Sequence, residues 1–153
     1  MKPMGQKGFT LIELVVVLVI IMAGAGLLVP NIGVWLPNYR LKSAARDIVS
    51  AMRTAQIRAI STSLQYRVNF NADEVGAGNS FILQKNSGGG WANDGAIQTL
   101  PVGITVDIDQ LPGGRALFNP NSTATAGSAT LQNTMGAQKK ISITSATGRV
   151  RIE

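Results

Sequence analysis

The sequence lacks cysteine and histidine altogether, and aromatic residues make up only 5% of it. Without cysteine the chain forms no disulfide bond and offers no thiolate for a zinc site or for nucleophilic catalysis. Without histidine it lacks the commonest general base and the commonest ligand of transition metals. These two absences argue against ordinary hydrolases and metalloenzymes, so we expect no enzymatic activity and no cofactor.

Charged residues are also scarce, and most of them are basic. They make up 14% of the 153 residues, and 14 Lys and Arg against 8 Asp and Glu give a net charge of +6. A soluble domain usually has about 25% charged residues, and the hydrophobic content of 45% is too high for a disordered chain. The length suits one compact domain, and the charge is compatible with a polyanionic partner.

The hydrophobic residues are concentrated in one run near the N-terminus, residues 9–29. A helix of this length measures about 31 Å, which is close to the hydrocarbon thickness of a bilayer, about 30 Å. We therefore expect residues 9–30 to form a transmembrane helix that contacts membrane lipid. Basic residues lie on both sides of the run, so their distribution does not decide its orientation.

One acidic residue, Glu13, lies within the apolar run. A carboxylate at the centre of a bilayer costs about 2.5 to 3.5 kcal/mol on insertion scales, and an acid in such a place is a functional candidate. An amine of a partner at the same depth would neutralise it and would favour assembly. The alternative is a carboxylate that reaches the interfacial water.

Around this acid the residues read Gly8-Phe9-Thr10-Leu11-Ile12-Glu13-Leu14. This motif resembles the processing site of type IV prepilins and type II secretion pseudopilins. The resemblance implies that a prepilin peptidase removes the basic leader 1–8 by cutting between Gly8 and Phe9, and that Phe9 is N-methylated. It also implies that Glu13 and Phe9 act in assembly, where Glu13 pairs with the N-terminal ammonium of a neighbouring pilin or pseudopilin subunit.

Helix-breaking residues follow the apolar run, and a second helical pattern comes after them. A proline inside a helix costs about 3 kcal/mol, so we expect the helix to break near Pro30 and Pro37. Between residues 38 and 63 apolar residues recur every three or four positions, which predicts that 31–63 continues as a helical stem. Basic residues border the apolar face, and we interpret them as a solvated edge, with a binding surface as the alternative. The apolar face consists of Leu41, Ala45, Ile48, Val49, Met52, Ala55, Ala59 and Ile60.

From residue 64 onward the pattern changes to short strands separated by turn residues. We therefore expect an α+β fold, in which an N-terminal helical stem packs against an antiparallel β-rich head formed by 64–153. The expected strands are 64–70, 81–84, 104–108, 117–118 and 129–132, and the expected loops include 86–90 and 122–130.

The last residues predict a β-hairpin whose turn is 145–148. In that register the two apolar pairs fall on one face of the hairpin, as packing against the stem helix requires. The other face carries the arginines. The expected opposite pairs are Ile143 with Val150, Ile141 with Ile152, Thr144 with Arg149, Ser142 with Arg151, and Lys140 with Glu153.

The stem, the β-rich head and the element Gly148-Arg149-Val150-Arg151 together resemble the GspH/FimT group of minor pseudopilins and minor pilins. The resemblance implies a non-catalytic structural subunit of a type II secretion pseudopilus or a type IV pilus, which helps to initiate or cap the filament. It also implies a single-pass protein of the bacterial inner membrane, with its head in the periplasm or, after assembly, on the cell surface.

The arginines of this element admit two interpretations. In FimT-type minor pilins a Gly-Arg-x-Arg element is implicated in binding incoming DNA, whereas secretion pseudopilins often carry a similar strand. Arg149 and Arg151 project from the same strand face about 7 Å apart, which suits contacts with successive phosphates, and Lys139 and Lys140 would extend the patch. Alternatively, the two arginines are solvated and protect an edge strand from aggregation.

Overall fold

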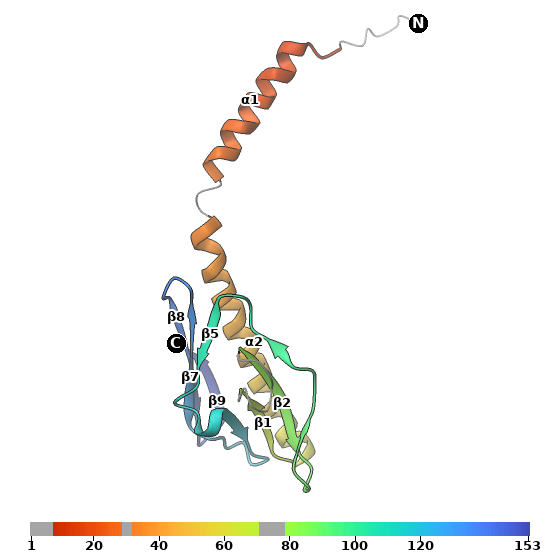
Figure 1. The fold of residues 1–153 in the computed structure, drawn as a ribbon. Helices are drawn as coiled ribbons and strands as arrows, with labels where there is room; N and C mark the ends of the chain where they lie inside the picture. Colours follow the sequence, from red (N-terminus) through yellow and green to blue (C-terminus); the bar gives the residue numbers. More distant parts are fainter. Residues whose placement is uncertain (1–7, 29–31, 71–78) are drawn as a thin grey trace, which may run out of the picture. The chain divides into compact units, whose positions relative to one another are not determined.

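The computed structural model describes residues 8–28, 32–70 and 79–153 of the chain (Figure 1). The leader before Gly8 and the expected helix break at Pro30 lie outside these residues. The chain divides into two compact units, Met1–Leu36 and Pro37–Glu153.

In the first unit, helix α1 spans Leu11–Leu28. Thr10 caps it, because the amide of Glu13 donates to Thr10 Oγ1 at 3.3 Å and the amide of Leu14 donates to the Thr10 carbonyl at 3.3 Å. Within the three described ranges, no helix combines the length and the hydropathy that crossing a membrane requires.

Helix α2 spans Ile32–Thr62 and includes Pro37. The expected break at Pro37 is therefore not found, and the helix continues through this residue. The missing N–H of Pro37 gives up one main-chain bond, to the carbonyl of Gly33, and this cost is offset because the helix from Leu41 onward buries one face in the core of the head.

In the second unit two antiparallel sheets pack on α2 (Figure 1). The first has the order β3-β2-β1-β6, with β4 also paired to β2, and the second has the order β5-β7-β8-β9. This arrangement confirms the expected α+β fold with an antiparallel head. The strands are β1 Tyr66–Asn69, β2 Ser80–Asn86, β3 Trp91–Asn93, β4 Gln98–Thr99, β5 Ile104–Asp107, β6 Arg115–Phe118, β7 Gly127–Asn133, β8 Gln138–Thr144 and β9 Arg149–Ile152, and a short 3-10 turn spans Pro112–Gly114.

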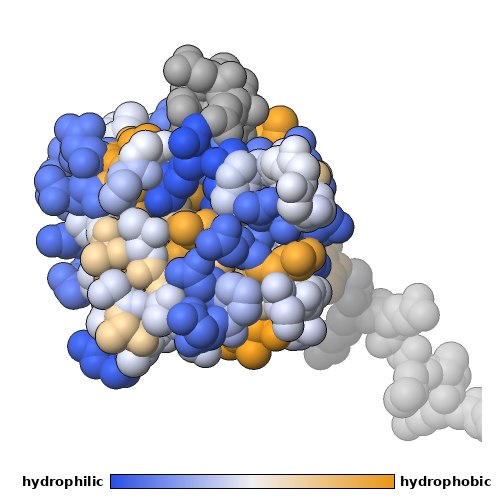
Figure 2. All heavy atoms as spheres, turned by 90° about the horizontal axis from the view of Figure 1, so that it is seen from below, coloured by the Kyte–Doolittle hydropathy of each residue, from blue (hydrophilic) through white to orange (hydrophobic). Residues whose placement is uncertain are grey.

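One hydrophobic core joins α2 to both sheets. Its residues lie between Leu41 and Val150, so the second unit contains the whole of this core. The predicted apolar face of α2 is buried except for Ile60, which is 47% exposed. On the face of the molecule seen in Figure 2, hydrophobic residues form separate spots among hydrophilic ones.

The hairpin register is confirmed at each of its strand pairs, from Thr144 opposite Arg149 to Ile141 opposite Ile152. The expected burial is wrong at one position, because Ile152 is 41% exposed while its neighbour Val150 is buried. The strands β3 and β4 were not expected, and β7 begins at Gly127, inside the expected loop 122–130. Segments rich in Asn, Gln, Ser and Thr show no clear alternation of apolar and polar residues, so the strands they pair with determine their conformation.

Candidate functional site

The predicted processing site lies at the start of the described chain. Gly8 and Phe9 precede α1, have no regular secondary structure and are exposed, and the side chain of Phe9 is 86% exposed. An exposed, non-helical peptide bond is the kind of backbone that a protease can bind in extended form. The geometry therefore leaves the Gly8–Phe9 bond accessible to cleavage.

Glu13 lies in the first turn of α1, one turn beyond this bond. Gly8, Phe9, Thr10 and Glu13 line one shallow hollow of about 330 Å³. Glu13 is exposed, and a negative charge in a first turn interacts favourably with the helix dipole. The carboxylate is thus presented beside Phe9, on a helix whose described side chains are all exposed.

The predicted arginine pair lies on the edge strand β9. Arg149 and Arg151 are both exposed, and both project from the face that also carries Thr144 and Ser142 of β8. An acid lies on the same face, because the Ser142 hydroxyl donates to Glu153 Oε1 at 2.8 Å. The patch is therefore basic but contains one carboxylate.

The two lysines expected to extend this patch lie on opposite faces of β8. Lys140 shares the arginine face, since its backbone pairs with that of Glu153. Lys139 is half-buried and shares the other face with Ile141, which packs in the core. Adjacent residues of a strand point to opposite sides, so the expectation that Lys139 joins the arginine patch is wrong.

The turn of this hairpin is fixed to α2. Gln56 Nε2 donates to the carbonyl of Thr147 at 2.9 Å. Gly148 has a φ of +61°, and a Cβ built on it would lie 2.7 Å from Gln56 Nε2 and 2.8 Å from the carbonyl oxygen of Ser122. The glycine of the Gly-Arg element is therefore required by packing. Gln56 was not foreseen from the sequence, because nothing local marks a partner 91 residues away.

The basic residues of α2 that border its apolar face have two different structural roles. Arg40 Nη1 donates to the carbonyl of Val102 at 3.3 Å, and Arg58 forms an ion pair with Asp94, so both hold loops of the head on the helix. Arg46 and Arg53 are exposed and line a groove beside Ile152.

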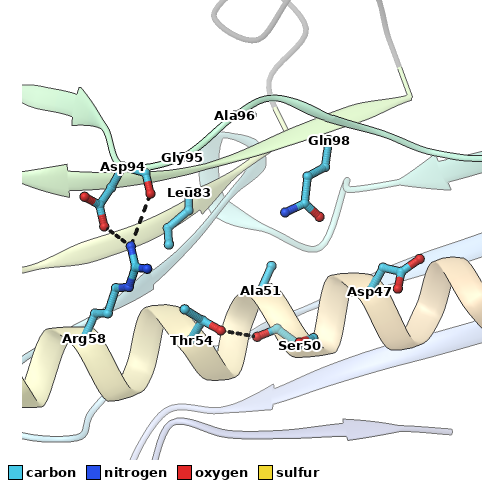
Figure 3. Close-up of a pocket in the computed structure, with 10 residues that line it drawn as sticks. All are labelled: Asp47, Ser50, Ala51, Thr54, Arg58, Leu83, Asp94, Gly95, Ala96 and Gln98. Carbon is cyan, nitrogen blue, oxygen red and sulfur yellow. Dashed lines mark hydrogen bonds and ion pairs between the residues drawn. The ribbon is translucent and has the colours of Figure 1, made fainter.

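A pocket of about 300 Å³ lies between α2 and the residues that join β3 to β4 (Figure 3). Arg58 reaches from the helix to the carboxylate of Asp94 and donates to the Asp94 carbonyl at 3.2 Å, while Lys85 Nζ lies 3.3 Å from Asp94 Oδ1. Burial raises the pKa of Asp94, but the hydrogen bonds and charges of Arg58 and Lys85 outweigh it and lower the pKa below 3.8. In the part of the chain that the structure describes, no three acidic side chains gather to hold a metal ion.

Replacing Asp94 by asparagine is expected to lower the free energy of unfolding at pH 7 by about 0.5 to 1 kcal/mol, because the ion pairs are partly solvated. The lowered pKa means that this contribution is present above pH 3.8 and is lost as the pH falls through the pKa of the folded protein. Urea unfolding at pH 7 and at pH 3 measures the difference. The exposed Asp109→Asn is the matched control, and a deficit of Asp94→Asn that grows at pH 3 would contradict the assignment.

Comparisons with known proteins agree with this geometry. The family profile called Prokaryotic N-terminal methylation motif matches residues 3–29. The fold is similar to that of the minor pseudopilin EpsH of the Vibrio cholerae type 2 secretion system, with a TM-score of 0.60 and 14% identity over 74% of this chain and 96% of that one. It is pilin-like. The type IV minor pilin FimU of Pseudomonas aeruginosa shares this pilin-like fold, with a TM-score of 0.59 and 19% identity over 74% of this chain and 92% of that one.

No curated protein sequence matches this chain closely enough to count as a relative. The methylation motif covers residues 3–29, which include the Gly8–Phe9 bond and α1. The solved structures add that the fold is pilin-like.

Proposed function

We propose that the chain is a non-catalytic minor subunit of a type II secretion pseudopilus or a type IV pilus. A prepilin peptidase would cleave the chain between Gly8 and Phe9, and Phe9 would be methylated. The mature chain would remain in the inner membrane until assembly. One observation carries the proposal: Glu13 is the only acid in an exposed apolar helix that begins at Leu11, close to the exposed Gly8–Phe9 bond.

Glu13 gives the proposed assembly step its driving force. In lipid the carboxylate is costly, and an amine at the same depth on a neighbouring subunit would relieve that cost. The new N-terminus of such a neighbour supplies an amine of this kind once its leader is removed. The pair would also set the stagger between subunits, because the two groups must meet at the same height.

A minor role is proposed because the face of the molecule seen in Figure 2 is mostly hydrophilic, with scattered hydrophobic residues. Quantitative mass spectrometry of purified filaments tests it. The mature chain, beginning at Phe9, is expected at a small fraction of the amount of the main subunit. A filament built chiefly of this chain would contradict the minor role, and its complete absence from filaments would contradict the whole proposal.

A second candidate function, reception of DNA for uptake, is favoured by the exposed pair Arg149 and Arg151 with Lys140 on the same face. Guanidinium groups at alternate strand positions are suited to neighbouring phosphates and would bind without reading sequence. Glu153 on the same face opposes such binding.

If DNA is the ligand, the unit Pro37–Glu153 is expected to bind duplex DNA with an affinity that falls steeply with salt, about tenfold or more between 50 and 200 mM. Arg149→Ala/Arg151→Ala should remove most of this binding. Lys139→Ala is the matched control, since Lys139 lies on the opposite face. The absence of binding at low salt would exclude the DNA candidate and leave the structural role.

A further inference from the structure

The strand β9 has one open side among the described strands, because it ends its sheet next to β8. Lys140 and Glu153 exchange both main-chain bonds, at 3.2 and 2.7 Å. Bonded and non-bonded pairs alternate along an antiparallel ladder, so Val150 and Ile152 turn their N–H and C=O groups away from β8. β9 therefore presents backbone donors and acceptors to which another strand can pair.

A groove of about 390 Å³ lies beside this open strand. Its lining includes Val49, Ile57 and Ile152, with Arg46 and Arg53. Ile57 is 66% exposed and Ile152 is 41% exposed, although both are β-branched hydrophobic residues. An edge that served only to prevent aggregation would carry charge without adjoining apolar surface.

Arginines border the open strand on both faces of its sheet. Arg46 and Arg53 lie on the α2 side with the groove, and Arg149 and Arg151 project from the other face. Two copies of β9 paired to each other would bring these like charges together, which disfavours self-association. A strand with acidic residues on one face would instead place them next to Arg149 and Arg151.

We propose that β9 binds an extended acidic segment of another protein, which adds to the sheet as a further strand. Side chains of the added strand alternate between the two faces. Those on the α2 side would fill the groove between Ile57 and Ile152 with apolar groups. Those on the other side would place carboxylates beside Arg149 and Arg151, whose two charges outnumber the single carboxylate of Glu153 on that face. The partner segment therefore alternates acidic and apolar residues.

This proposal rests on the proposed function, because it names the chemistry of a contact that a filament subunit would make with a neighbour or cargo. The two proposals can be tested separately, because the strand contact involves the head and not Glu13. Duplex DNA would satisfy the arginines but would use neither the groove nor the backbone of β9. The strand and the groove therefore favour a protein segment over a nucleic acid.

Fluorescence anisotropy of a labelled heptapeptide of alternating Glu and Val, titrated with the full chain in neutral detergent micelles, tests the proposal. Binding is expected, and replacing each Glu of the peptide by Lys should abolish it. Methylation of alternate peptide amides, which blocks strand pairing, should weaken binding by about tenfold or more. Ile152→Pro should weaken binding to a similar extent, because it removes the N–H of residue 152, which points to the open side of β9 and not to β8.

Ile57→Ser is expected to weaken binding by about tenfold, whereas Ile60→Ser, an exposed residue of α2 outside the groove, should change it by less than about twofold. No binding of the Glu and Val peptide would overturn the proposal. Equal binding of the methylated peptide would also overturn it. Tighter binding of duplex DNA that is unaffected by Ile57→Ser would assign the surface to polyanions instead. None of these results would bear on assembly through Glu13.

Discussion

Glu13→Ala is expected to remove the chain from filaments, with at least about a tenfold loss of incorporation, while the protein stays in the membrane. The substitution deletes the only carboxylate of α1, so the amine of a neighbour would lose its partner at that depth. Immunoblots of sheared filaments and of membrane fractions measure the two quantities. Membrane retention should persist or improve, because an uncharged residue inserts more easily than an acid.

Two controls make the Glu13 result specific. Glu13→Asp keeps the charge on a shorter side chain and should retain part of the incorporation. Asp109→Asn removes an exposed carboxylate of the head and should leave incorporation unchanged. If Glu13→Ala entered filaments at the level of the unmodified chain, the proposed pairing of Glu13 with an ammonium would be wrong.

Gly148→Ala is expected to destabilise the head by about 2 to 4 kcal/mol, the second large effect. The residue has a left-handed φ of +61°, which costs an alanine about 1 to 2 kcal/mol. The new Cβ would also meet Gln56 Nε2 and the carbonyl oxygen of Ser122 at less than 3 Å, and the latter is backbone that moves only with its loop. Urea unfolding of the unit Pro37–Glu153, which contains the whole described core, measures the change.

Gly89→Ala is the matched control for this prediction. Gly89 has no positive φ, and nothing lies within 4 Å of a Cβ built on it, so the change should stay within about 0.5 kcal/mol. Equal stability of the Gly148→Ala and Gly89→Ala proteins would show that the turn does not pack on α2 as described. Because Arg149 and Arg151 are exposed, their replacement should leave stability nearly unchanged, which separates binding from folding effects.

Much of the fold could be predicted because its patterns are local. The three- and four-residue spacing of Leu41, Ala45, Ile48 and Met52 predicts the buried face of α2, and all four are buried. The hairpin register follows from the pairing of Ile143 with Val150 across a four-residue turn, and the observed pairs agree. Alternating strands and periodic helices carry their side-chain directions in the sequence itself.

Other features depend on contacts between distant segments, and the sequence does not express them. β3 and β4 are short strands that form against β2, without a pattern of their own. Pro37 is tolerated in α2 because the helix beyond it buries one face in the core of the head, which a general cost for proline does not capture. The hydrogen bond from Gln56 to the carbonyl of Thr147, which leaves no room for a side chain at Gly148, joins residues far apart in the chain.

The candidate sites divide in the same way. The motif from Gly8 to Glu13 is contiguous, so it could be identified directly, and the matched methylation profile covers it. The arginine face could be predicted by strand alternation, and the same alternation places Lys139 on the opposite face. The groove beside β9 could not be predicted from the sequence, because Ile57 and Ile152 come from different elements.

Carbodiimide cross-linking of intact filaments tests the central claim most directly, because the reagent joins a carboxylate only to an amine in contact with it. After digestion, mass spectrometry should find Glu13 of this chain linked to the N-terminal residue of another subunit, and Glu13→Gln should abolish that linked peptide. Filaments in which this chain is cross-linked only through residues of its head, with Glu13 unmodified, would contradict assembly through the pairing of Glu13 with an N-terminal amine.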